Sequence, residues 1–267
     1  MQNNYQQYFD ANKEGWNKKT AIHKTSSFYD LESFKKGKSS LNKIELDEVG
    51  DVKGKALLHL QCHFGMDTLS WAKEGAIVTG VDISDEAIQL ANELSAELNI
   101  PAQFICCNVY DTSNHVHQKF DIIFTSYGTI GWLPSLKPWA KVIAQNLKPG
   151  GVFYIADFHP TLWMYDDAME KIEYSYFNDE VIETAQTGTY ADRYAKIEYK
   201  EYGWNHPFSE ILECLISEGL QIEFLHEFPY SPYNCFSNVE QGNDGMWRFK
   251  DRGNKFPMMY SIKAVKR

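Results

Sequence analysis

An aspartate that follows a glycine turn indicates a site for a nucleotide ribose. Asp82 ends the apolar run 77–81 and lies 17 positions after Gly65. A carboxylate at the end of such a strand can accept hydrogen bonds from two adjacent hydroxyls, which is how a ribose presents them. The same carboxylate can instead cap the helix that follows it. The position alone does not decide between a ligand and a cap.

Three histidines are candidates for a general base, because an unperturbed imidazole titrates near neutral pH. His159 directly follows an apolar run that ends at Asp157, whereas His206 and His226 lie further along the chain. For each of them a structural or surface role is the competing interpretation. His159 is the strongest candidate, because we expect it at the carboxyl end of a strand.

These residues lie at the ends of alternating strands and helices. Helical spacing follows Gly65 and Ser84, and it recurs before the turn 148–151 and again at 207–218. Such alternation predicts a mostly parallel sheet with helices on both faces and ligands at the carboxyl ends of its strands. The runs that predict strands are 56–60, 77–81, 102–106, 120–125, 152–157, 221–227 and 258–265.

The domain organisation follows from where this regularity stops. We expect an N-terminal helical cap at 1–50, a core at 51–157 and 207–267, and an inserted substrate-side cap at 158–206. Alternating stretches at 172–177 and 194–199 predict antiparallel strands in the insertion. An aromatic loop from Phe228 to Trp247, together with three more rings, is expected to form a lid; these rings are Trp16, Tyr190 and Trp204.

Composition excludes several classes of protein. The 267 residues carry a formal net charge of −10, which repels a phosphate backbone and argues against nucleic acid. There is no apolar run long enough to span a membrane and no signal-peptide pattern at the start, so we expect a cytoplasmic protein. No histidines or acids fall at metal-ligand spacing, so no metal is expected. A small-molecule substrate fits these limits, and the oligomeric state stays open.

Five segments together resemble the class I S-adenosylmethionine-dependent methyltransferases over about residues 55–157. They occur in the family's order and at its spacing: LLHLQCHFGMDTL, VTGVDIS, NVYD, FDIIF and NLKPGG. The resemblance implies an α/β, Rossmann-like sheet of seven strands with a reversed C-terminal hairpin, and an antiparallel insertion as its lid. It also implies S-adenosylmethionine as cofactor and methyl transfer to a small acceptor by in-line displacement.

The resemblance also implies a role for each matching position. Tyr127 would present an aromatic face to the sulfonium and take part in catalysis, although packing under the insertion is the competing interpretation. The cofactor residues run from the methionine end through the ribose and adenine to the sulfonium: Gln61, Cys62 and Gly65, then Asp82 and Ile83, then Asn108 and Val109, and finally Ser126 and Tyr127.

The first segment departs from the family pattern of one acid and three glycines. This chain has His59, Gln61 and His63 there and keeps only Gly65. Gln61 and His63 therefore require either a loop bent differently or side chains used as contacts. A degenerate, non-catalytic binder of S-adenosylmethionine is the alternative function. A nicotinamide-dependent dehydrogenase is disfavoured, because its G-x-G-x-x-G turn is missing.

Overall fold

A seven-stranded sheet forms the centre of the computed structural model, which describes residues 5–267, and its strand order is β3-β2-β1-β4-β5-β11-β8. The first five strands in the chain run parallel, and β11 is antiparallel to both of its neighbours. This confirms the predicted sheet with its reversed C-terminal hairpin. The strands are β1 (Ala56–Leu60), β2 (Ile77–Asp82), β3 (Ala102–Cys106), β4 (Phe120–Ser126), β5 (Leu147–Phe158), β8 (Leu220–Phe228) and β11 (Met259–Lys266).

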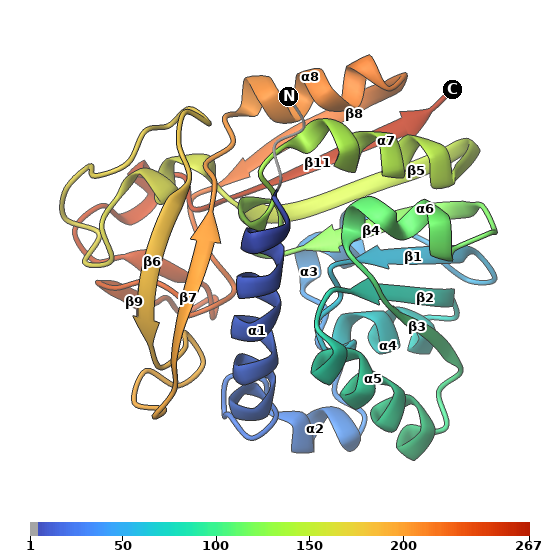
Figure 1. Cartoon of the computed structure of the whole chain (residues 1–267), viewed down its shortest axis with the longest axis horizontal. Helices are drawn as coiled ribbons and strands as arrows, with labels where there is room; N and C mark the ends of the chain where they lie inside the picture. The colour runs from blue at the N-terminus through green and yellow to red at the C-terminus, as the bar shows by residue number, and fades with distance from the viewer. Residues whose placement is uncertain (1–4) are drawn as a thin grey trace.

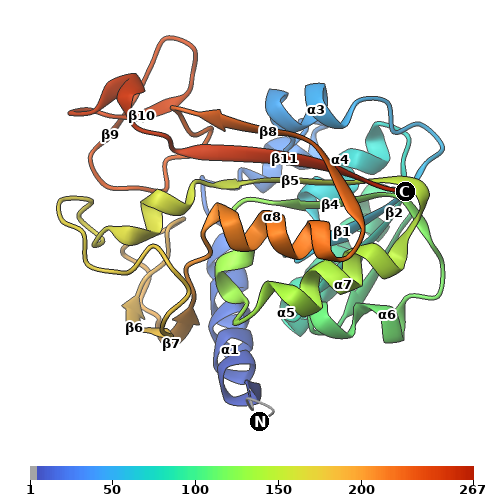
Figure 2. The same cartoon turned by 90° about the horizontal axis from the view of Figure 1, so that it is seen from above.

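Helices cover both faces of the sheet, because successive strand residues point to opposite sides. Leu57 packs in one cluster with Trp71, and Leu58 packs in another with Trp139. Figure 2 shows α3 (Lys43–Val49) and α4 (Met66–Lys73) on one side, and α7 (Leu136–Asn146) and α8 (Phe208–Ser217) on the other. The remaining helices are α2 (Leu31–Lys35), α5 (Asp85–Leu98) and α6 (Thr112–His115).

The parallel strands point their carboxyl ends toward helix α1 (Gln6–His23) and a hairpin inserted after β5 (Figure 1). The hairpin consists of β6 (Ile182–Thr187) and β7 (Glu198–Gly203). Asn12 of α1 joins the helix to β7, since its side chain donates to the carbonyl of Tyr202 and accepts from the amide of the same residue, both at 2.8 Å. The N-terminal helix and the insertion therefore cover the same end of the sheet.

The insertion contains an antiparallel pair as predicted, but the predicted bounds were wrong: 172–177 forms no strand, and 194–199 overlaps the observed strand only at its last two residues. The antiparallel pair lies at β6 and β7, and Ile172 makes only an isolated bridge with Tyr165. Alternation of apolar and polar residues predicts a strand only where a partner supplies hydrogen bonds, and Ile172 is 64% exposed. The aromatic loop contains a further short pair, β9 (Val239–Gln241) and β10 (Trp247–Phe249).

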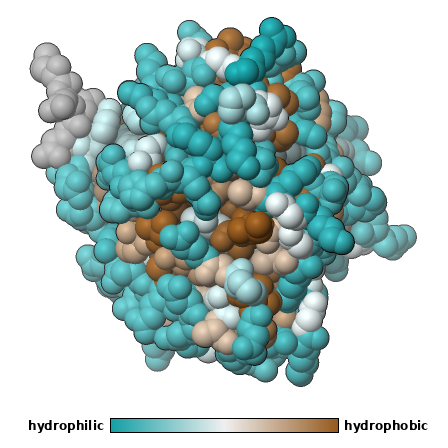
Figure 3. All heavy atoms as spheres, turned by 90° about the vertical axis from the view of Figure 1, so that its right-hand side faces the viewer, coloured by the Kyte–Doolittle hydropathy of each residue, from teal (hydrophilic) through white to brown (hydrophobic). Residues whose placement is uncertain are grey.

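The face of the molecule at the right of Figure 1, where the parallel strands begin, is mainly hydrophilic at its rim, with hydrophobic residues gathered nearer its middle (Figure 3). Within residues 5–267 we find no helix whose length and apolar character would suit a membrane span. The cytoplasmic location stays a prediction.

Candidate active site

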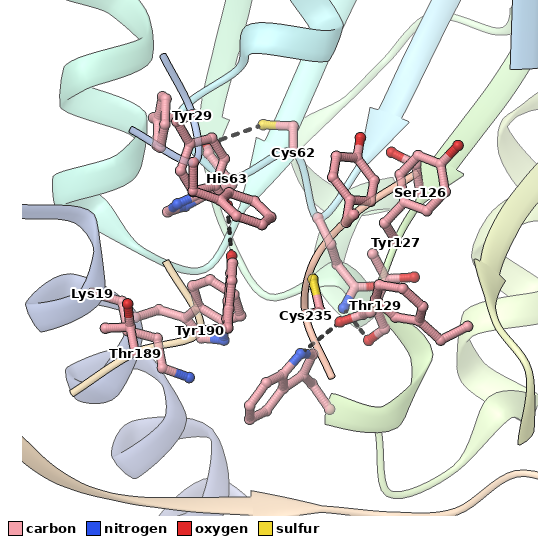
Figure 4. A pocket seen from close by; sticks show the side chains of 18 of the residues that line it. Lys19, Tyr29, Cys62, His63, Ser126, Tyr127, Thr129, Thr189, Tyr190 and Cys235 are labelled. Carbon is pink, nitrogen blue, oxygen red and sulfur yellow. Dashed lines mark hydrogen bonds between the residues drawn. The ribbon is translucent and has the colours of Figure 1, made fainter. Parts of the chain in front are cut away.

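A cavity of about 940 Å³ lies at the carboxyl ends of β1 to β4. Ligand sites of small molecules have volumes of roughly 300–1,000 Å³. Every residue predicted to bind the cofactor lines this cavity. Much of the rest of its wall comes from α1, the segments 28–42 and 158–169, the β6–β7 hairpin and the loop 232–237. Figure 4 shows the cavity between Tyr29 and His63 on one side and Ser126 and Tyr127 on the other.

The loop after β1 keeps a left-handed backbone where the resemblance expects glycine. The φ angles are 56° at Gln61, 51° at His63 and 78° at Gly65. The amide of His63 donates to Oδ2 of Asp82 at 2.8 Å, which fixes this turn against the end of β2. Each non-glycine residue in this conformation costs about 1–2 kcal/mol. The loop is therefore not bent differently, and surrounding contacts hold its strained residues.

The side chains of Gln61 and His63, which stand where the resemblance expects glycine, make hydrogen bonds beside the cavity. Nε2 of Gln61 donates to the carbonyl of Thr129 at 2.8 Å, and Nε2 of His63 lies 2.9 Å from Nδ1 of His23. Among the described residues, the buried Oε1 of Gln61 and Nδ1 of His63 have no hydrogen-bond partner. Both residues line the cavity, so these two atoms offer a ligand an acceptor and an uncommitted imidazole nitrogen.

Gly65 is required by both its backbone and its surroundings. A Cβ at this position would lie 2.6 Å from Cε1 of Phe104 and 3.1 Å from Cβ of Ala91. We expect Gly65→Ala to lower the free energy of unfolding by about 2–4 kcal/mol, from the left-handed φ and the overpacking together. Urea denaturation measures this change.

Gly219→Ala is the matched control for Gly65→Ala. Gly219 follows the end of α8 with a φ of 82°, and a Cβ there meets nothing within 4 Å. It should cost only the backbone strain, about 1–2 kcal/mol. Equal losses in the two variants would contradict the role of Phe104.

The carboxylate of Asp82 joins the loop after β1 to the start of α5, and its binding of a ribose stays a prediction. Its Oδ1 accepts from the amide of Ser84 at 2.9 Å, at the start of α5, while Oδ2 accepts from the loop. Burial raises the pKa of this carboxyl to about 6, against the lowering effect of these backbone hydrogen bonds. Because a carboxylate oxygen has more than one acceptor site, Asp82 can still accept from ligand hydroxyls in the cavity.

The adenine and methionine ends of the predicted site also keep internal contacts. Oδ1 of Asn108 accepts from the amide of Tyr110 at 3.0 Å, while Ile83 and Val109 line the wall beside it. The thiol of Cys62 donates to the carbonyl of His63 at 3.6 Å, and burial raises its pKa well above the usual value. A thiol held protonated in this way is a poor nucleophile.

The end of β4 connects the cavity to two carboxyl groups. The hydroxyl of Tyr127 donates to Oε2 of Glu45 at 2.6 Å, and Oγ of Ser126 donates to Oδ2 of Asp67 at 3.2 Å. Tyr127 has a φ of 53°, and its ring packs against that of Tyr233 with centroids 4.9 Å apart. Glu45 and Asp67 were not identified from the sequence, because nothing in their spacing places them beside β4.

Asp157, at the end of β5, holds the loop that follows β4. Its carboxylate accepts from the amides of Gly128, Thr129 and Phe158 and from the hydroxyl of Thr129. Thr129 in turn holds Gln61 through its carbonyl. Asp157 does not line the cavity, but through Thr129 it helps to fix the position of Gln61, which does.

Aromatic rings line the side of the cavity that faces the insertion. The hydroxyls of Tyr29 and Tyr190 are 2.5 Å apart, and the ring of Phe28 stacks on that of Tyr233 at 5.7 Å. Of the rings predicted for a lid outside the aromatic loop, Trp16 and Tyr190 line the cavity, whereas Trp204 packs on Tyr8 elsewhere.

An ion pair joins α1 to the insertion at the cavity wall. Nζ of Lys19 lies 2.7 Å from Oε2 of Glu201, and three rings surround the ammonium with centroids 4.6–4.7 Å away: those of Trp16, Trp132 and Tyr199. Lys19 is only 4% exposed. The two residues are 182 positions apart in the sequence, and no local pattern predicts that they form an ion pair.

The histidines proposed as general bases lie outside the cavity lining. Nε2 of His159 contacts Oε1 of Glu227 and Nδ1 contacts Oγ1 of Thr161, both at 2.8 Å. His206 contacts Glu210 and a backbone carbonyl, and His226 contacts a glutamate of α3. The structure therefore does not bring His159 together with Tyr127 and the cofactor residues, and both of its ring nitrogens are already engaged.

Comparison with known proteins identifies the family. Residues 57–151, which include the loop after β1, Asp82 and the end of β4, match a family model described as a methyltransferase domain. Residues 57–151 are therefore a methyltransferase domain of the class I, S-adenosylmethionine-dependent type, set in a sheet with the fold of such enzymes. S-adenosylmethionine is the cofactor of this methyltransferase fold.

Similar curated proteins include ubiquinone biosynthesis O-methyltransferases. The chain is 31% identical to that of Photorhabdus laumondii over 134 residues, which are 48% of this chain and 55% of the relative. It is 25% identical to that of Saccharophagus degradans over 208 residues, 77% of this chain and 81% of the relative. The first of these alignments spans about half the length of the curated relative, so it does not identify the methyl acceptor of this chain.

Solved structures share the fold. A S-adenosylmethionine-dependent methyltransferase from Clostridium acetobutylicum matches with a TM-score of 0.59 and 16% identity, over 94% of this chain and 98% of that chain. One from Methanosarcina mazei matches with a TM-score of 0.55 and 16% identity, over 85% of this chain and 98% of that chain.

The residues of this methyltransferase fit S-adenosylmethionine. The unpartnered Oε1 of Gln61 is placed at the predicted methionine end, where it can accept from the ammonium of the cofactor. Asp82 lines the cavity at the position predicted for the ribose. The left-handed φ angles of the loop would let its backbone approach the ligand closely without glycine at every position.

Proposed function

We propose that the chain transfers a methyl group from S-adenosylmethionine to a small acceptor bound in the aromatic half of the cavity. The observation that carries this proposal is the continuity of the cavity. The same space of about 940 Å³ is lined by Asp82 and Gln61 of the cofactor half and by Tyr190 and Tyr233 of the insertion and the C-terminal loop. Two ligands can therefore meet there with water largely displaced.

The protein's contribution is positioning. When bound, S-adenosylmethionine supplies a methyl group already activated by the sulfonium, so the residues need to align and desolvate the two ligands. Asp82 would hold the ribose, Gln61 the ammonium, and Ser126 and Tyr127 would border the sulfonium. The aromatic wall would orient the acceptor by stacking.

The aromatic wall favours an acceptor that is itself aromatic. Phe28, Tyr29 and Tyr190 line the cavity with aromatic rings and two hydroxyls, which suits a flat molecule with polar substituents. Because the curated relatives are named O-methyltransferases, phenols are the first acceptors to test. Aromatic amines and thiols form the comparison set.

Titration calorimetry with S-adenosylmethionine and S-adenosylhomocysteine tests cofactor binding. We expect Asp82→Ala to weaken both ligands by about 1–3 kcal/mol, because the ribose hydroxyls lose their acceptor. Asp85→Ala is the matched control, since Asp85 is an exposed neighbour that pairs with Lys13. Equal effects of the two substitutions, or no binding by the wild-type protein, would refute the proposed cofactor site.

Turnover then separates the enzyme from the alternative of a non-catalytic binder. Formation of S-adenosylhomocysteine with any member of the acceptor set establishes methyl transfer. Tight cofactor binding without turnover across phenols, amines and thiols would favour the binder.

A further inference from the structure

Two carboxyl groups lie directly behind the residues that border the predicted sulfonium position. Glu45 of α3 accepts from the hydroxyl of Tyr127, and Asp67 of α4 accepts from the hydroxyl of Ser126. Glu45 is 0% exposed. Its other partners are the backbone amide and side-chain amide of Asn42, at 2.7 and 3.2 Å, and Asp67 accepts in addition from Ser40 at 2.6 Å. In residues 5–267 neither group has a cationic partner.

A buried carboxylate without a cation is unstable in its charged form. Burial raises the pKa of Glu45 to about 7 and also raises that of Asp67. The titratable groups around Glu45 are neutral or acidic: Asp67 of α4, Tyr127 after β4, Tyr154 of β5 and Tyr233 of the C-terminal loop. The positive charge missing from this corner can be brought by a ligand in the cavity.

We propose that Glu45, acting through the hydroxyl of Tyr127, releases a proton when S-adenosylmethionine binds and takes one up when the sulfonium charge is lost. This rests on the proposed function, which places the sulfonium beside Ser126 and Tyr127. The geometry is a continuous path from the cavity wall to a carboxylate, with 2.6 Å between the Tyr127 hydroxyl and Oε2 of Glu45. Asn42 holds the other carboxylate oxygen in place.

The proton and charge balance closes without another reactant. As a bond forms between the acceptor atom and the methyl carbon, the bond from that carbon to sulfur breaks and its electron pair stays on sulfur. The acceptor's proton passes to the oxygen of Tyr127, while the hydroxyl proton of Tyr127 passes to Glu45. One positive charge on sulfur and one negative charge on Glu45 disappear together, so no unpaired charge remains buried.

The proposal predicts how cofactor affinity depends on pH. Binding of a cation lowers the pKa of Glu45, so the bound form holds fewer protons and affinity falls as pH falls through 7. Between pH 8 and pH 6 we expect the dissociation constant for S-adenosylmethionine to rise about tenfold. S-adenosylhomocysteine lacks the sulfonium charge and should show much less of this change.

The decisive experiment is titration calorimetry of the full chain with each ligand at pH 7, in phosphate and in Tris. These buffers differ in ionisation enthalpy, so the difference in heat counts the protons released. We expect about half a proton per S-adenosylmethionine, because Glu45 with a pKa of about 7 is half protonated at this pH. Asp82 contacts the ribose of both ligands, so its titration cancels in the comparison between them.

Glu45→Gln tests the assignment and should fold, because glutamine can also accept from the amide of Asn42 in the capping box. We expect it to abolish the difference in proton release between the ligands. The matched control is Glu48→Gln, on the same helix, where the carboxylate accepts from the hydroxyl of Tyr154 and not from Tyr127.

The outcomes separate this inference from the proposed function. Absence of binding by the wild-type chain would remove the proposed function itself. Binding of S-adenosylmethionine without proton release, or unchanged release in Glu45→Gln, would overturn the role of Glu45 and leave cofactor binding intact. Release that is lost in Asp67→Asn but kept in Glu45→Gln would assign the proton to Asp67 and likewise overturn the proposal.

Discussion

Replacing Glu201 with alanine is expected to lower the free energy of unfolding by about 3–5 kcal/mol, because it leaves the ammonium of Lys19 buried without its counter-ion. The three surrounding rings attract the charge but do not replace a carboxylate. Desolvation already lowers the pKa of Lys19 despite the ion pair. Thermal and urea denaturation measure the loss, and hydrogen exchange in α1 and β7 shows where the structure loosens.

The pH dependence of this loss has a definite sign. Without Glu201 the folded-state pKa of Lys19 falls further below its usual value of 10.5. At pH values between these two pKa values, the unfolded chain binds more protons than the folded one. The loss of free energy of unfolding in Glu201→Ala should therefore become smaller as pH rises. Glu198→Ala, an exposed position on the same strand, is the control for strand propensity. Equal losses in the two variants would show that the ion pair contributes nothing.

Asp157→Ala should cost more than about 3 kcal/mol, because its carboxylate satisfies three backbone amides and one hydroxyl in a buried place. Released from Asp157, the segment at Gly128 and Thr129 no longer holds Gln61. We therefore expect the variant to lose affinity for S-adenosylmethionine although Asp157 does not line the cavity. Denaturation and calorimetry measure the two effects.

Two further variants calibrate this prediction. Asp157→Asn keeps one acceptor oxygen but points an amide at donors, so its loss should be smaller than that of alanine. Asp121→Ala removes a carboxylate near the start of β4 that accepts from the amide of Ala56 and from Lys148. It should reduce stability while leaving cofactor affinity unchanged. If Asp121→Ala lowers the affinity for S-adenosylmethionine as much as Asp157→Ala does, the loss of affinity reflects general destabilisation and not the contact of Asp157 with the segment at Gly128 and Thr129.

The clustering of the residues proposed to bind the cofactor could be predicted, because local sequence determines the strands that carry them. The strands were visible as apolar runs, and parallel strands necessarily bring Gly65, Asp82, Asn108 and Ser126 to one edge of the sheet. The left-handed φ of Gln61 and His63 could not be predicted from propensity. His63 is held by the hydrogen bond from its amide to Asp82, and Gln61 by the hydrogen bond from its side chain to Thr129.

The acceptor half depends on contacts between distant segments, which no local pattern encodes. Lys19 meets Glu201 only because α1 docks on β7, and neither residue has a distinctive spacing. Asn42 and Glu45 have the spacing of a capping box, which indicates a helix start but not a contact with Tyr127. His159 was singled out by its position after β5, yet its ring turns toward β8 and contacts Glu227.

The way the cavity is assembled has a consequence for engineering. Part of its wall comes from α1, the β6–β7 hairpin and the loop 232–237, all outside the matched segment 57–151. Because Asn12 and Lys19 tie α1 to the hairpin, these two pieces form a cassette that must be transplanted together. A chimera that exchanges both pieces should acquire new acceptor selectivity while keeping its cofactor, whereas a graft of the hairpin alone would leave Lys19 without its counter-ion.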